Sequence, residues 1–162
     1  FCFFLLRLLR SAAVDPVLAK HVDLDPIDCL DHQTLVYRIE HVADHAANIA
    51  KHIIMLEGDQ QKIPEPLLKL MLAFCNDAVD LYNKAVDSFF SKDTTSCNDV
   101  IERQAKIEKS AREIASQSFL IPQMSAATIC AVCTIRDSMK RIADWAAEIA
   151  EGTILRSYKE KS

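Results

Sequence analysis

An internal repeat constrains the fold of this 162-residue chain more than any other feature of its sequence. The segment EHVADHAANIA at 40–50 recurs as KRIADWAAEIA at 140–150, displaced by 100 positions. Both copies contain a helical apolar pattern, and both carry an aspartate at the same place, Asp44 and Asp144. A repeated segment of this kind predicts a repeated supersecondary structure and a repeated site.

The composition favours an all-α protein. Two glycines and five prolines supply little turn material for a β-sheet, whereas 50% of the residues are hydrophobic. The prolines mark segment ends, and those at 16 and 26 bracket a predicted polar connection. The segments between the prolines predict helices near 1–14, 27–57, 66–91, 97–119 and 123–158. Short connections between long amphipathic helices predict an antiparallel up-and-down bundle of about five helices, of which two are the repeated helices.

Apolar residues recur at helical spacing and predict the faces that pack on partner helices. In the segment 27–57 they are Leu35, Ile39, Val42, Ala46, Ile49, Ile53 and Leu56. In the segment 66–91 they are Met71, Cys75, Ala78, Tyr82, Ala85 and Phe89. The stripe of the segment 97–119 consists of Val100, Gln104, Ile107, Ala111, Ile114 and Ser118. Ser96 is the predicted N-cap of this last helix, with Asp99 in its first turn.

Acidic side chains accompany both copies of the repeat. Because a helix turns about 100° per residue, positions four apart project from nearly the same side. The acids are Glu40 and Asp44 in the first copy and Asp137, Asp144, Glu148 and Glu151 in the second. Like charges one turn apart repel, and carboxylates bind ions such as Mg, Mn, Fe and Zn, so these acids are candidate metal ligands. The alternative is a solvated acidic face balanced by Lys51, Lys140 and Arg141.

The charge and the N-terminal residues restrict the possible partners. A net charge of -4 provides no broad basic surface, which disfavours nucleic-acid binding. The apolar run at 1–6 is too short to span a bilayer core of about 30 Å, so no membrane insertion is expected. An exposed apolar face there predicts an oligomer contact, and we expect a homo-oligomer.

Six cysteines are interpreted as reduced core thiols of a cytoplasmic protein, because most of them fall within apolar helical patterns. Cys130 and Cys133 form a CxxC motif, which can be redox-active or bind zinc. No second CxxC and no alternating strand–helix pattern accompanies the motif, so a structural role in the core is favoured.

Both copies of the repeat resemble the paired signatures of PhoU-type phosphate uptake regulators. The likeness is carried by RIEHVADHAANIA at 38–50 and KRIADWAAEIAE at 140–151. The segments 5–13 and 26–31 are similar to the archaeal branch of the family, and the resemblance covers most of the chain.

The resemblance implies two related three-helix bundles. Residues 1–60 would be the C-terminal part of the first, and residues 61–162 the complete second. Members carry an acid-x-x-x-acid motif in each bundle, reported to bind metal ions or clusters. Glu40 and Asp44 match it, whereas the second copy keeps Asp144 but has Lys140 in place of the first acid.

The family further implies regulation rather than catalysis. PhoU-type proteins restrain phosphate import and phosphate signalling by contacting the ATPase of a phosphate ABC transporter or a related regulator. A DNA-binding domain precedes the bundles in many archaeal relatives, and in this protein it would lie upstream of Phe1.

One alternative is a dimetal enzyme in which carboxylates bridge two metal ions within a helical bundle. Such enzymes need a Glu-x-x-His motif on each of two helices. Glu40 and Glu148 are instead followed, three positions later, by Ala43 and Glu151. A purely structural interaction bundle is the other alternative to the regulatory function.

Histidines in the first copy suggest a second kind of metal site. His41 and His45 lie one helical turn apart, a spacing that can chelate zinc. Trp145 replaces His45 in the second copy, which argues against histidine as part of the shared chemistry.

Overall fold

The computed structural model describes residues 1–58, 62–122 and 124–159, and over these residues the chain is all-α, as predicted. The described residues form six helices and no strand: α1 (Cys2–Ala12), α2 (Pro16–Val22), α3 (Pro26–Gly58), α4 (Glu65–Ser91), α5 (Thr94–Leu120) and α6 (Ala126–Lys159). They divide into two compact units, residues 1–43 and 44–162, with the unit boundary inside α3. Within the described ranges, no helix has an apolar stretch long enough to cross a bilayer.

Helix α2 occupies the stretch for which the sequence predicts a polar connection. The Asp15 carboxylate accepts hydrogen bonds from the backbone N–H groups of Val17 and Leu18, at 2.9 and 3.3 Å. Pro16 begins the helix, where its missing N–H group has no cost. Asp23 ends it in the left-handed conformation, with φ at 52°. These local capping interactions form a helix that buries none of its residues, which is why no apolar stripe signals it.

The unit of residues 1–43 has a small apolar core. Helices α1 and α2 pack on each other. The buried apolar residues of this unit are Leu6, Leu9, Ala12, Cys29 and Leu35. Phe3 and Phe4 are 77% and 69% exposed, so the exposed apolar face predicted at the N-terminal run is present. The homo-oligomer expected from this face stays a prediction.

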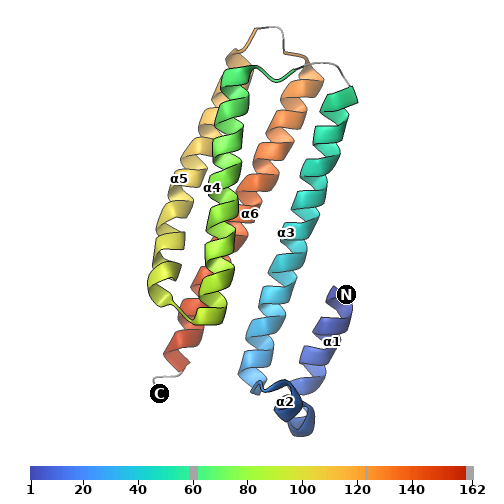
Figure 1. Cartoon of the computed structure of the whole chain (residues 1–162), viewed down its shortest axis with the longest axis vertical. Coiled ribbons are helices and arrows are strands. Elements are labelled where there is room, and N and C mark those ends of the chain that lie inside the picture. The colour runs from blue at the N-terminus through green and yellow to red at the C-terminus, as the bar shows by residue number, and fades with distance from the viewer. Residues whose placement is uncertain (59–61, 123, 160–162) are drawn as a thin grey trace. The chain divides into compact units, whose positions relative to one another are not determined.

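Helices α4, α5 and α6 pack pairwise and form an antiparallel three-helix bundle in the unit of residues 44–162 (Figure 1). Its centre consists of fully buried side chains, among them Leu67, Leu81, Val100, Ile114, Val132 and Ile149. The stripes predicted for the second and third long helices face this core, because most of their residues in α4 and α5 are buried. The periodicity therefore identifies the packed faces of these two helices correctly.

The N-cap predicted for α5 is wrong by three positions. Asp93, and not Ser96, is the cap: its carboxylate accepts hydrogen bonds from the backbone N–H groups of Thr95 and Ser96, at 3.0 and 3.2 Å. Both residues are of types that cap helices, and the aspartate comes first along the chain. The helix consequently begins at Thr94.

The Asp93 cap predicts a pH-dependent contribution to stability. Hydrogen bonds from Ser96, then from Thr95, and the charge of Lys84 lower the pKa of the Asp93 carboxyl below its ordinary 3.8. A lowered pKa means that the stabilising interaction is complete above that ordinary value and is lost as the pH falls through the folded-state pKa. We expect Asp93→Ala to lower the denaturant midpoint near neutral pH, and the difference from wild type to shrink below about pH 3.8.

Urea titrations at several pH values measure this effect. Asp87→Ala is the matched control, because Asp87 is an exposed aspartate inside α4 and is not the N-cap of a helix. A pH-independent difference between Asp93→Ala and wild type would contradict the assignment of the cap.

The two repeated helices differ in burial. In α6, Ala146 and Ala150 are completely buried in the bundle with α4 and α5. Their counterparts in α3, Ala46 and Ala50, are exposed, and Ile53 on the same helix is 53% exposed. One sequence pattern thus occupies two environments, a covered face in α6 and, within the described residues, a largely uncovered face in α3.

Candidate functional site

Asp144, the aspartate of the second repeat copy, has its charge neutralised within the protein. Lys140 Nζ donates to both carboxylate oxygens, at 3.2 Å from Oδ1 and 3.0 Å from Oδ2. Gln104 Nε2 in α5 donates to Oδ1 at 2.8 Å, and Arg141 Nη1 lies 3.5 Å from Oδ2. The Asp144 side chain is only 16% exposed. A half-buried carboxylate with these donors has its hydrogen-bonding capacity largely satisfied.

Glu108 in α5 extends this network across the helix pair. Its Oε1 lies 4.0 Å from Lys140 Nζ, and its Oε2 lies 3.9 Å from Arg112 Nη1. The ammonium group of Lys140 therefore lies between a carboxylate of α5 and a carboxylate of its own helix. We call this network the α5–α6 polar seam; it consists of Gln104, Glu108, Lys140, Arg141 and Asp144.

The sequence alone did not identify the α5 members of the seam. Gln104 and Glu108 lie one turn apart and face α6, but neither belongs to the repeat. The available signal was Gln104 itself, because a polar amide interrupts the otherwise apolar stripe between Val100 and Ile107. Half-buried polar groups need partners, so such an interruption indicates a hydrogen bond to a neighbouring helix.

The other predicted ligands of α6 lie apart from any metal-binding cluster. Asp137 is 62% exposed and pairs with the adjacent Arg136 at 2.6 Å, while Glu148 is half-buried. Among the residues that the structure describes, no three His, Cys, Asp or Glu side chains come together in a group that could hold a metal ion. In the second copy, the Lys140 ammonium therefore lies between Asp144 and the nearest described acid of α5, Glu108, and Arg141 lies beside Asp144.

The acids of the first copy belong to different units. Glu40 lies half-buried in the unit of residues 1–43, close to Cys2. Desolvation, followed by the charge and hydrogen bonding of Glu40, raises the pKa of the Cys2 thiol. Asp44 is exposed in the unit of residues 44–162. Metal binding by this pair stays a prediction.

The cysteines lie partly in the interior and partly on the surface of the helices. All six cysteines are free, and two of them, Cys29 and Cys97, are buried. Cys130 is exposed and Cys133 half-buried, so the interpretation of the CxxC motif as core is wrong for its first member. The motif lies inside α6 and leaves Cys130 on the outer side of the bundle. His41 is exposed, as expected for the polar side of α3.

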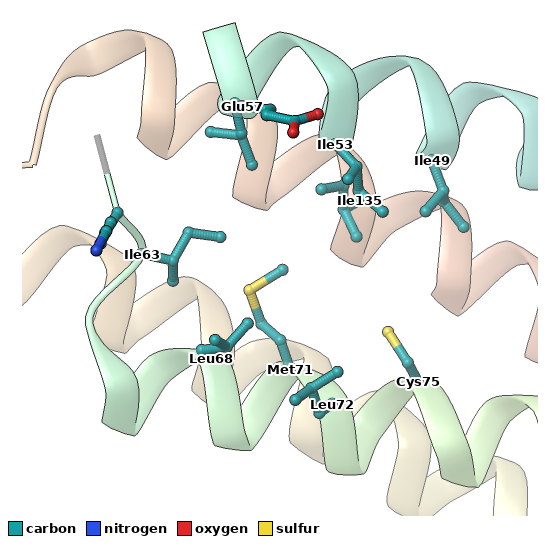
Figure 2. Close-up of a pocket in the computed structure, with 11 residues that line it drawn as sticks. Ile49, Ile53, Glu57, Ile63, Leu68, Met71, Leu72, Cys75 and Ile135 are labelled. Carbon is teal, nitrogen blue, oxygen red and sulfur yellow. The ribbon is translucent and has the colours of Figure 1, made fainter. Parts of the chain in front are cut away.

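An apolar cavity of about 780 Å³ lies between the C-terminal part of α3 and helices α4 and α6 (Figure 2). Ile53 of α3, Met71 of α4 and Ile135 of α6 line it, and Figure 2 shows the Met71 side chain extending into the space. Beside it, Asn48 Nδ2 in α3 donates to Ser138 Oγ in α6 at 2.9 Å. Glu57 and Lys62 are the charged members of a lining that is otherwise made of apolar side chains and Cys75. Such a lining suits an apolar group better than a metal ion or a phosphate group.

Comparison with known proteins adds one match. A family model described as "PhoU domain" matches residues 72–153, which begin in α4 and end in α6 and make up just over half of the chain. The matched span contains the entire α5–α6 polar seam. Neither the comparison with curated proteins nor that with solved structures found a match.

Proposed function

Because the chain belongs to the PhoU family, we propose that it restrains phosphate uptake and phosphate signalling by binding the ATPase of a phosphate transporter or a related regulator. The observation that carries this proposal is the PhoU domain match over α4, α5 and α6. Membership assigns the chain to a family of regulatory helical domains that function in phosphate uptake. The identity of the partner is the further step that we propose.

Exposed apolar side chains support a function through protein contacts. Ile54 of α3 is 67% exposed and Leu72 of α4 is 55% exposed, while Phe3 and Phe4 are exposed on α1. Exposed large apolar side chains become typical of protein interaction sites where they lie next to one another on the surface. We propose that such surfaces bind the partner ATPase and a second copy of the chain. We also propose a cytoplasmic location, which follows from the interpretation of the six cysteines as reduced thiols.

A regulatory function also suits the chemistry of the site better than catalysis does. The α5–α6 polar seam consists of paired charges and an amide, and it contains no nucleophile with a base beside it. The cavity next to α3 is lined almost entirely by apolar side chains. We therefore propose that the protein is not an enzyme.

The metal-binding part of the proposal rests on the motif of the first copy. Glu40 and Asp44 supply carboxylate oxygens one turn apart in sequence, which suit Mg, Mn, Fe or Zn. A bound ion would offset the repulsion between these two acids. Asp44→Ala is therefore expected to bind less metal than wild type.

The proposed function predicts a change in phosphate uptake. In cells that lack their own PhoU-type regulator and take up phosphate without restraint, expression of this chain is expected to lower the initial rate of radiolabelled phosphate uptake. The reason is that the bound ATPase would cycle less often. The purified chain is also expected to bind the purified ATPase in a titration.

The matched control expresses the chain with Leu81→Ala, which removes a side chain at the centre of the bundle and should weaken the effect by destabilising the bundle that carries the binding surface. Normal folding of the wild-type chain together with unchanged uptake and no binding of the ATPase would contradict the proposed partner.

A further inference from the structure

The two repeat copies differ in their charged residues at three equivalent positions, 40/140, 41/141 and 48/148, and the first of these lies one turn before the shared aspartate. Position 40 is glutamate in the first copy, and the equivalent position 140 is lysine in the second. Asp44 and Asp144 occupy the same place one turn further along their helices. The second copy therefore has a cation–acid pair in the register where the first copy has an acid–acid pair.

The geometry shows what this lysine does. Its Nζ lies 3.0 Å and 3.2 Å from the two carboxylate oxygens of Asp144 and 4.0 Å from Oε1 of Glu108. The ammonium thus lies between two carboxylates that come from different helices. A metal ion that joined the same two acids would have to occupy this space, since ligand oxygens lie roughly 2.0–2.6 Å from a bound Mg or Ca ion.

Gln104 and Arg141, the other two partners of Asp144, also disfavour a metal ion at this carboxylate. Gln104 donates an N–H to Asp144, so it presents a donor where a metal site would need an acceptor. Arg141 adds a second positive charge 3.5 Å from the same carboxylate. A divalent cation at Asp144 would be repelled at close range by the half-buried Lys140 ammonium and, more weakly, by the exposed Arg141 guanidinium.

We infer that the ammonium of Lys140 is a built-in cation that takes the place of a metal ion in the second repeat copy, so that the α5–α6 polar seam is complete without metal. The residues present at Asp144 do not fit the metal that the family implies. This inference concerns the bundle itself and holds independently of which partner the protein regulates.

A manganese titration in the Asp44→Ala background tests the inference. This substitution removes a ligand of the first copy, so wild type is expected to bind more Mn²⁺ than Asp44→Ala, and the remaining signal reports on the second copy alone. We expect Mn²⁺ to broaden the side-chain NMR signals of Asp144 and Gln104 in Asp44→Ala no more than those of Asp137 and Glu148 on the same helix. Paramagnetic broadening that is strongest at Asp144 would mean that Asp144 binds the ion in the native sequence and would overturn the inference.

Restoring the acid provides the complementary measurement. Asp44→Ala combined with Lys140→Glu recreates an acid-x-x-x-acid motif beside Glu108 and is expected to bind Mn²⁺ at least about tenfold more tightly than Asp44→Ala alone, with broadening at Asp144. Lys109→Glu, the same charge reversal at an exposed position of α5, is the matched control and is expected to produce no gain.

If Lys140→Glu does not fold, Lys140→Gln removes the positive charge without adding a negative one. Lys140→Gln is expected to lower the melting temperature in buffer with EDTA. It is also expected to bind Mn²⁺ at Asp144, but with a lower affinity than Lys140→Glu. A folded Lys140→Glu or Lys140→Gln protein whose affinity for Mn²⁺ equals that of Asp44→Ala would show that Lys140 is not the group that excludes the ion.

Discussion

Leu81→Ala is expected to lower the free energy of unfolding by about 3 kcal/mol, whereas Leu72→Ala in the same helix is expected to lower it by less than about 1 kcal/mol. Leu81 is completely buried in α4, and Leu72 is 55% exposed. Removing a buried leucine forfeits its transfer free energy and leaves a cavity that the neighbouring helices fill only in part.

This pair of substitutions separates packing from helix propensity, because both replace leucine by alanine in α4. Urea unfolding followed by far-UV circular dichroism gives the two free energies. Equal losses for Leu81 and Leu72 would mean that the bundle of α4, α5 and α6 does not bury Leu81 at its centre.

Ala146→Leu is expected to lower the free energy of unfolding by about 2 kcal/mol, while Ala46→Leu should change it by less than about 0.5 kcal/mol. The two alanines occupy equivalent positions of the repeat. Ala146 is completely buried where α6 packs in its bundle, and Ala46 is exposed on α3. A larger side chain at the buried position forces the helices apart or adopts an unfavourable rotamer.

The same urea titrations measure this second pair. Since both changes are from alanine to leucine in nearly the same local sequence, the difference between them reports on tertiary packing alone. Equal effects at the two positions would contradict the difference in burial between the repeated helices.

Much of the fold follows from periodicity and from helix-breaking residues. The apolar stripes of α4 and α5 are the faces that the bundle buries, because side chains three and four positions apart share one side of a helix. Helix α3 has an apolar stripe with the same spacing as those of α4 and α5. Two residues of this stripe, Ile39 and Ile53, are nevertheless 39% and 53% exposed. A pattern identifies the apolar side of a helix and does not say whether another helix covers it.

Helix ends depend on interactions that are less distinctive in sequence. Asp93 and Ser96 are both suitable caps, and only the positions of the N–H groups decide between them. Helix α2 is capped at its two ends by Asp15 and Asp23, and none of its residues is fully buried. The division of the chain into residues 1–60 and 61–162 stays a prediction.

The candidate site was predictable in part. Asp144 could be identified from the repeat, since its equivalent Asp44 recurs in register. Its partners Gln104 and Glu108 could not, because the pairing of two helices depends on their relative rotation and register. Metal binding by Glu40, Asp44, Asp137 and Glu148 stays a prediction, whereas at Asp144, the fifth predicted ligand, we infer that Lys140 takes the place of the ion.

The lysine between the two acidic side chains of the seam also affects how the bundle responds to its surroundings. Occupancy of a metal site follows the free concentration of the ion and falls when the supply is short. A positive charge carried on the polypeptide is present once in every molecule as soon as it is synthesised. The bundle of α4, α5 and α6 should consequently keep the same stability under metal starvation and metal excess.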